Sequence, residues 1–141
     1  MNDAKLKGIL LIDDDPISHF LNKKVIEKLD INVHVQTVDS AQAGLEMMKY
    51  SQDVFFRPCL ILLDLNMPGM TGWDFIEAYK DLGMDFSEQT QIVILSTSEN
   101  PDDRAKAKGY KEVHHYLSKP LGVDYLQKVI GEIWPATFKE Y

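Results

Sequence analysis

Short apolar runs alternate with longer stretches in which apolar residues recur at helical spacing. Most of the short runs are rich in branched aliphatic residues, which is typical of a β-strand. The predicted strands are Gly8–Ile12, Val33–Val38, Cys59–Leu63, Gln91–Leu95 and Val113–Leu117. The runs 8–12 and 59–63 contain no polar side chain, which indicates strands buried on both faces of a sheet. The run 33–38 alternates and is expected nearer an edge.

The stretches between these runs have the pattern of helices with one apolar face. The predicted helices are Pro16–Leu29, Ala41 to about Tyr50, about Trp73 to Leu82, Pro101 to about Lys108, and Val123–Trp134. In the first helix, an inward face is expected from Ile17, Phe20, Leu21, Val25 and Leu29. Asp15 and Asn100 each precede a proline, so both are expected to be N-cap residues. The polar connector Met84 to Thr90 is longer than a loop between the preceding helix and the following strand requires.

Five strands alternating with five helices predict an α/β fold with a parallel sheet covered on both faces. The connections between parallel strands are expected to be right-handed. We detect no internal repeat and no low-complexity segment. The 141 residues are therefore expected to form one domain, residues 1–141, with a core at about 7–134 and short tails.

Composition narrows the class of protein. The formal net charge of −7 disfavours direct binding to nucleic acid or to an anionic membrane. No apolar stretch approaches the ~20 residues of a membrane span, and the N-terminus has no apolar signal region. Cys59 is the single cysteine, so an intramolecular disulfide is excluded and a reducing compartment is expected. We therefore predict a cytoplasmic protein.

Polar side chains of a particular kind follow four of the strands. Asp13 and Asp14 follow the first strand, Asp64 the third, Ser96 the fourth and Lys119 the fifth. Parallel strands point the same way, so these residues are expected at one edge of the sheet, where open α/β sheets bind ligands. Any one of them alone could be a helix cap or a solvated loop residue. Their joint occurrence predicts a functional site.

Three carboxylates in one pocket repel each other, and a hard divalent cation such as Mg²⁺ relieves the repulsion. A metal, an ammonium group and a hydroxyl around an aspartate suit phosphoryl transfer. In that chemistry the carboxylate acts as nucleophile and forms an acyl phosphate.

The motifs that carry these residues resemble those of the receiver domains of response regulators in two-component signalling. The resemblance covers nearly the whole chain and rests on ILLIDDDP (9–16), LDLNMPGMTG (63–72), LSTS (95–98) and YLSKPL (116–121). It implies the flavodoxin-like fold, a (βα)5 three-layer sandwich with strand order 2-1-3-4-5.

The resemblance also implies roles for the residues of the pocket. Asp64 would accept a phosphoryl group from a phosphohistidine of a partner. Asp13, Asp14 and Asp64 would hold Mg²⁺, together with the backbone carbonyl of Asn66. Lys119 would pair with the phosphoryl oxygens.

Two further residues take the family's switch positions. The Ser96 hydroxyl would move toward the phosphorylated Asp64, and Tyr116 would turn into the space vacated. The surface formed by the fourth helix, the fifth strand and the fifth helix would then change shape for a partner. The family motif also implies a cis peptide bond before Pro120.

The expected partners are a histidine kinase or histidine phosphotransfer protein and a downstream protein, with signalling by protein contact or by onward transfer of the phosphoryl group. We expect no enzymatic turnover beyond self-catalysed phosphotransfer and autodephosphorylation. Two alternatives remain at this stage. One is a pseudo-receiver that never takes phosphate. The other is a phosphatase resembling the haloacid dehalogenases, although Asn66 stands where those enzymes have a second acid.

The histidines are assigned structural roles. His114 and His115 are adjacent in a predicted strand, so their side chains are expected on opposite faces, which argues against a metal pair. His19 and His34 are expected at the surface, and Cys59 is expected in the core.

Overall fold

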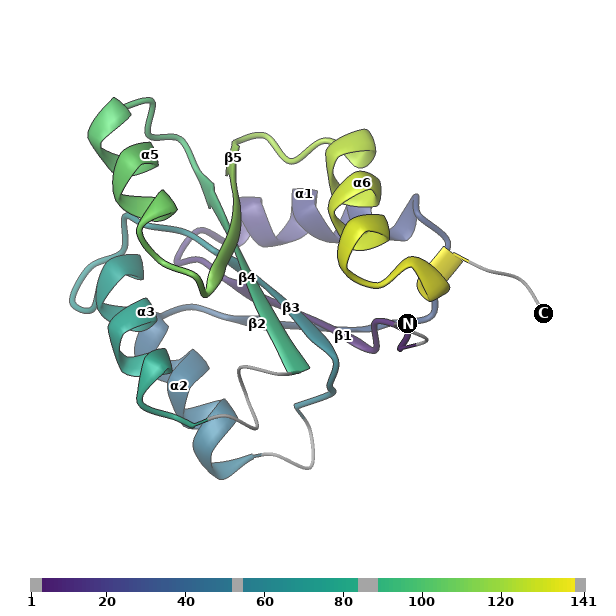
Figure 1. Ribbon diagram of the computed structural model, residues 1–141, viewed down its shortest axis with the longest axis horizontal. Coiled ribbons are helices and arrows are strands. Elements are labelled where there is room, and N and C mark those ends of the chain that lie inside the picture. Colours follow the sequence, from purple (N-terminus) through teal and green to yellow (C-terminus); the bar gives the residue numbers. More distant parts are fainter. Residues whose placement is uncertain (1–3, 52–54, 84–88, 139–141) are drawn as a thin grey trace.

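The computed structural model describes residues 4–51, 55–83 and 89–138, and it has a single parallel sheet between two layers of helices (Figure 1). The strands are β1 (Gly8–Ile12), β2 (His34–Val38), β3 (Cys59–Leu63), β4 (Thr90–Ser96) and β5 (Val113–Ser118). Their order is β2-β1-β3-β4-β5 and every neighbouring pair is parallel. The predicted fold class and strand order are confirmed.

The described helices are α1 (Pro16–Glu27), α2 (Ala41–Tyr50), α3 (Gly72–Lys80), α5 (Pro101–Lys108), α6 (Val123–Ile133) and the short 3-10 helix η1 (Pro135–Phe138). Asp15 and Asn100 are N-caps, as predicted, and each accepts a hydrogen bond from the backbone two residues on. The predicted connector lies mostly outside the described residues. None of the described helices has both the length and the apolar character needed to cross a membrane.

Two apolar clusters hold the layers together. In β3, Cys59, Ile61 and Leu63 point to one face, and Leu60 and Leu62 point to the other. The first cluster joins the sheet to α2, α3 and α5, and the second joins it to α1 and α6 (Figure 1). Cys59 is a free, buried thiol, as expected.

Helix α1 is rotated relative to the prediction. Its buried residues are His19, Asn22 and Ile26. Ile17, Phe20 and Leu21 are instead 67%, 60% and 50% exposed, so the prediction that they face inward is wrong. The His19 side chain occupies the inner face because its Nε2 lies 2.8 Å from the carbonyl oxygen of Asp13. The apolar side chains are left on the surface.

Strand β5 contains a register shift against β4. Ile92 pairs with Val113 and the next residue, Val93, pairs with His115, so His114 is an extra residue. A β-bulge of this kind interrupts the alternation of side chains. The prediction that His114 and His115 point to opposite faces is therefore wrong, because both imidazole rings contact Glu132 of α6.

The peptide bond between Lys119 and Pro120 is cis, as the family motif implied. The bond between Arg57 and Pro58 is also cis, which was not predicted.

Candidate functional site

The register between β1 and β3 brings three aspartates together. Ile12 pairs with Leu63, so Asp13 and Asp64 leave the sheet side by side, and the Asp64 amide donates to the carbonyl oxygen of Ile12 at 3.0 Å. Carboxylate oxygens of Asp13, Asp14 and Asp64 all lie within 4.8 Å of one another. The predicted acidic cluster is therefore present in the structure.

Lys119 reaches this cluster from β5. Ser118 pairs with Ser96, and the Lys119 amide donates to the Ser96 carbonyl at 2.9 Å, which fixes the backbone beside the pocket. The Lys119 Nζ atom lies 2.7 Å from Asp13 Oδ2 and 3.9 Å from Asp64 Oδ1. It also donates to the Ser18 hydroxyl at 3.3 Å. One ammonium group thus lies within ion-pair distance of two of the three carboxylates, Asp13 and Asp64.

Burial sets the electrostatics of Asp64. The residue is only 7% exposed, and this desolvation raises the pKa of its carboxyl above the usual range. The charge of Lys119 opposes the rise, as does a hydrogen bond from the Asn66 backbone amide, whereas Asp13 and Asp14 add to it. A cation placed among the carboxylates would favour the ionised form, which is the nucleophilic one.

The chain enters α3 directly against Asp64. Thr71 caps this helix in a capping box with Asp74, and the Gly72 amide donates to the Leu65 carbonyl at 3.0 Å. A Cβ atom on Gly72 would lie 2.6 Å from the carbonyl oxygen of Asp64. Glycine therefore allows the close approach that holds the Asp64 backbone in place.

Ser96 and Tyr116 share a neighbour, Ser98. The Ser98 amide donates to the Ser96 hydroxyl at 3.1 Å, and the Tyr116 hydroxyl donates to the Ser98 carbonyl at 3.1 Å. The Ser98 hydroxyl donates to Asp103 in α5 at 2.6 Å. The loop after β4 is thus tied to β5 and to α5 through one residue.

Sequence reasoning missed two residues around the site. His19 was expected at the surface but is only 8% exposed and supports the Asp13 backbone. The Arg104 guanidinium lies over the Tyr116 ring at 4.6 Å and donates to the Ser118 hydroxyl at 2.7 Å. Neither role leaves a signal in the sequence, because each depends on a contact between separate elements.

The donor set suits a hard divalent cation. Asp13, Asp14 and Asp64 offer only carboxylate oxygens, and Asp14 is exposed, so retained water can complete the coordination. Mg²⁺ prefers oxygen ligands and keeps several waters in such sites. The residues present therefore fit Mg²⁺.

Comparisons with known proteins agree with this geometry. The sequence model of the response regulator receiver domain matches residues 9–131. A solved two-component response regulator from Cytophaga hutchinsonii is 32% identical, with a TM-score of 0.83, and the match covers 94% of this chain and 99% of that one. The Mn²⁺-bound form of the response regulator Rcp1 is 26% identical, with a TM-score of 0.71, over 90% of this chain and 91% of that one.

A curated relative is the nitrate/nitrite response regulator protein NarL of Escherichia coli (strain K12), which is 35% identical over 133 residues. The match covers 94% of this chain but only 56% of NarL. The chain thus spans little more than half the length of that relative.

Proposed function

Because the chain belongs to the response regulator receiver domain family of two-component signalling, we propose that Asp64 accepts a phosphoryl group from a phosphohistidine of a partner protein. The observation that carries this proposal is the convergence of Asp13, Asp14, Asp64 and Lys119 at one edge of the sheet. Response regulators act in two-component systems, in which the donor is a histidine kinase or a histidine phosphotransfer protein.

The geometry of the site supports the following transfer step. A carboxylate oxygen of Asp64 forms a bond to phosphorus, the phosphorus–nitrogen bond of the phosphohistidine breaks, and the imidazole nitrogen keeps the electron pair. Lys119 would leave Asp13 and pair with the phosphoryl oxygens, since its Nζ atom already lies between Asp13 and Asp64. The Asn66 amide keeps Asp64 oriented through its hydrogen bond to the carboxylate.

Asp13, Asp14 and Asp64 would hold Mg²⁺, with the Asn66 backbone carbonyl as a further ligand. When bound, the ion offsets the negative charge that gathers on the phosphoryl oxygens. The related response regulator Rcp1 has been solved in a Mn²⁺-bound form, which supports a divalent cation for this chain as well.

The response would start at Ser96. Its hydroxyl oxygen accepts from the Ser98 amide in the unphosphorylated protein, and a phosphoryl group on Asp64 would offer a charged acceptor to which the same hydroxyl can donate. As Ser96 turns toward that group, the Ser98 amide loses its acceptor and the loop shifts. Tyr116 and α5, which both hold Ser98, are then released to new positions. The surface of α5, β5 and α6 would change for a downstream protein.

The docking surface for the donor would lie on α1. Ile17, Phe20 and Leu21 are exposed there. A groove beside them is lined by Ser18, Leu21, Lys119 and Leu121, among others, so the apolar surface is continuous with the pocket. A partner that packs on these residues would bring its phosphohistidine to Asp64.

Labelling with acetyl phosphate tests the proposal. In the presence of Mg²⁺, intact-protein mass spectrometry should detect a single added phosphoryl group, and both chelation of Mg²⁺ and Asp64→Ala should abolish it. Asp81→Ala, in an exposed acid at the end of α3, is the matched control and should be labelled normally. Unchanged labelling of Asp64→Ala would refute the assignment. Catalytic hydrolysis of a phosphate monoester would indicate a phosphatase, because autodephosphorylation after labelling releases phosphate from acetyl phosphate only. No labelling at all would indicate a pseudo-receiver.

A further inference from the structure

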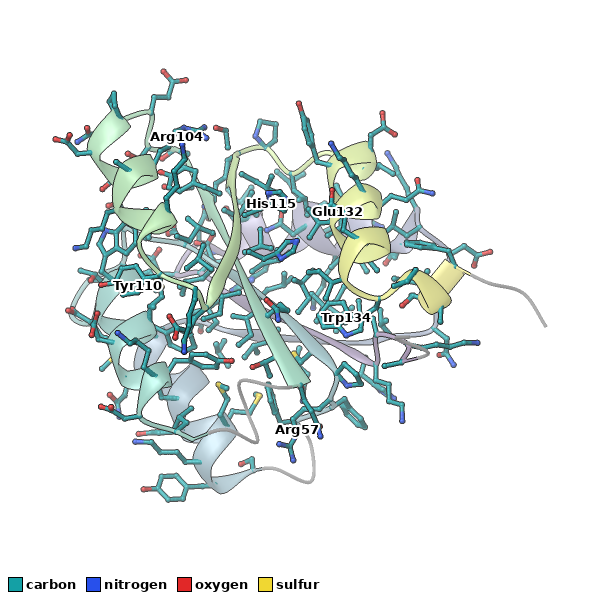
Figure 2. The ribbon with its side chains drawn as sticks, in the orientation of Figure 1. Arg57, Arg104, Tyr110, His115, Glu132 and Trp134 are labelled. Atoms are coloured by element: carbon teal, nitrogen blue, oxygen red, sulfur yellow. The ribbon has the colours of Figure 1, made fainter. Side chains whose placement is uncertain are left out.

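A second cluster of metal-binding side chains lies away from the acidic pocket, between β5 and α6. His115 Nε2 is 3.0 Å from Glu132 Oε2, and His114 Nε2 is 3.4 Å from the same oxygen. The ligand atoms of the three residues lie within 4.8 Å of one another. His115 of β5 and Glu132 of α6 lie side by side in Figure 2.

The bulge in β5 creates this arrangement. In a regular strand, one of two adjacent histidines would face away from α6. The extra residue at His114 lets both rings reach the same helix, edge to face, with centroids 4.6 Å apart. The side chains of His114, His115 and Glu132 are 31%, 41% and 40% exposed, so an ion from solvent has access to them.

We propose that His114, His115 and Glu132 bind a divalent transition-metal ion of the Zn²⁺ class. Zn²⁺ takes imidazole nitrogen and carboxylate oxygen at similar distances, and in a tetrahedral site neighbouring ligand atoms are about 3.3–3.4 Å apart. The two histidine–glutamate separations already approach this spacing. Three protein ligands leave a position for water.

Glu132 is available as a ligand because its carboxyl is ionised. Both histidines hold Glu132 in its ionised form, which lowers the pKa of that carboxyl, and Lys128 acts in the same direction. In the metal-free protein, the two rings satisfy one carboxylate oxygen. On metal binding each Nε2 atom must present its lone pair to the ion, so its proton moves to Nδ1 or is released.

Ligand chemistry separates this cluster from the acidic pocket. The pocket offers oxygen alone, which suits Mg²⁺, whereas two imidazoles suit Zn²⁺, Ni²⁺ or Cu²⁺. Of the two remaining histidines, His19 is buried with Nε2 against a backbone carbonyl, and His34 stacks on Phe56 at 3.7 Å. Burial raises the pKa of the Cys59 thiol, so it offers no thiolate. The inference does not depend on the proposed phosphotransfer.

Zn²⁺ titration against a chromophoric chelator tests the site, in the full chain and with excess Mg²⁺. One Zn²⁺ should bind to the wild-type protein. His115→Gln and Glu132→Gln should each weaken binding at least about tenfold, because loss of a supporting group alone costs 10–100-fold in metal sites. His34→Gln is the matched control and should bind like the wild type.

Two further measurements keep the result unambiguous. Zn²⁺ should shift the imidazole proton resonances of His114 and His115 but not those of His34, and it should raise the melting temperature of the wild type but not of His115→Gln. Zn²⁺ binding that survives in His115→Gln and Glu132→Gln would overturn the proposal. So would binding that disappears in Asp64→Asn, because that result would place the ion in the acidic pocket.

Discussion

The Lys119 ammonium group lies 2.7 Å from Asp13 Oδ2, closer than its 3.9 Å separation from Asp64 Oδ1. Asp13 is nearly buried, and Lys119 is the cation that balances it in the unphosphorylated protein. Under the proposed function, Lys119 must exchange this partner for the phosphoryl group. A bound cation would make that exchange easier, because it takes over the charge of Asp13.

Replacing Lys119 should therefore separate metal binding from phosphorylation. Lys119→Met removes the charge with little change in length, so we expect Mg²⁺ to bind several-fold more tightly, because one repelling cation is gone. Labelling of Asp64 by acetyl phosphate should slow by about a hundredfold, the usual cost of losing one group that stabilises an oxyanion. Calorimetric titration and time-resolved mass spectrometry measure the two effects.

Lys111→Met, at an exposed lysine outside the pocket, is the control and should change neither Mg²⁺ binding nor labelling. Unchanged labelling of Lys119→Met would contradict the assigned role.

The raised pKa of Asp64 makes the stability of the protein depend on pH. The folded state binds a proton at this carboxyl more tightly than the unfolded chain does. The resulting penalty on stability is absent below the unfolded pKa of about 3.9 and grows as the pH rises through the folded pKa. Asp64→Asn should therefore raise the free energy of unfolding at neutral pH without Mg²⁺.

Denaturant titrations at several pH values, in Mg²⁺-free buffer, check this prediction. The advantage of Asp64→Asn should shrink as the pH falls through the unfolded pKa of about 3.9 and vanish about one unit below it, where the wild-type carboxyl is protonated in both states. Asp81→Asn, in an exposed acid, is the control and should show no such trend. An advantage that is independent of pH would mean that charge at Asp64 is not the cause.

Ser96 is expected to transmit phosphorylation rather than to permit it. Ser96→Ala should still be labelled at Asp64, but the Ser98 loop and α5 should no longer respond, because the moving hydroxyl is absent. Amide hydrogen exchange across Pro101–Lys108, compared with and without acetyl phosphate, measures the response. Thr97→Ala is the control, because it removes the exposed hydroxyl of the neighbouring residue, and it should respond like the wild type. If phosphorylation changed amide exchange in Ser96→Ala as much as in the wild type, Ser96 would not be needed for the response.

The sequence was sufficient for the fold because β1 and β3 are unbroken apolar runs and the stretches between the strands have helical spacing. It was also sufficient for the convergence of Asp13, Asp64 and Lys119, because parallel strands deliver their following residues to one edge. The rotation of α1 and the bulge at His114 were not predictable. Each depends on a contact with another element, and no local periodicity encodes it.

The exposed side chains of α1 provide a test of the docking surface. Phe20→Ser should leave stability within about 0.5 kcal/mol of the wild type, because the ring is 60% exposed. Labelling by acetyl phosphate should also be unchanged. A cognate phosphohistidine donor can be found by screening histidine kinases, and transfer from that donor to Phe20→Ser should be at least about tenfold slower. A tenfold change corresponds to a loss of ~1.4 kcal/mol of binding free energy. Tyr50→Ser removes an aromatic ring that is 80% exposed on α2 and should leave both reactions intact. Equal donor transfer to Phe20→Ser and wild type would place the docking surface elsewhere.

Gly72 tests whether the backbone of Asp64 is held by the start of α3. Gly72→Ala adds a Cβ atom 2.6 Å from the Asp64 carbonyl oxygen and 2.9 Å from Leu65 Cα, so the backbone must shift. We expect a loss of about 1–3 kcal/mol in the free energy of unfolding, the usual cost of overpacking, together with slower labelling of Asp64. Gly131→Ala is the matched control, because its Cβ atom would meet only the Phe138 ring, at 3.9 Å, and alanine is the better helix former in α6. That variant should be stabilised slightly and labelled normally. If Gly72→Ala matched it in both measurements, close packing at Gly72 would not be what positions Asp64.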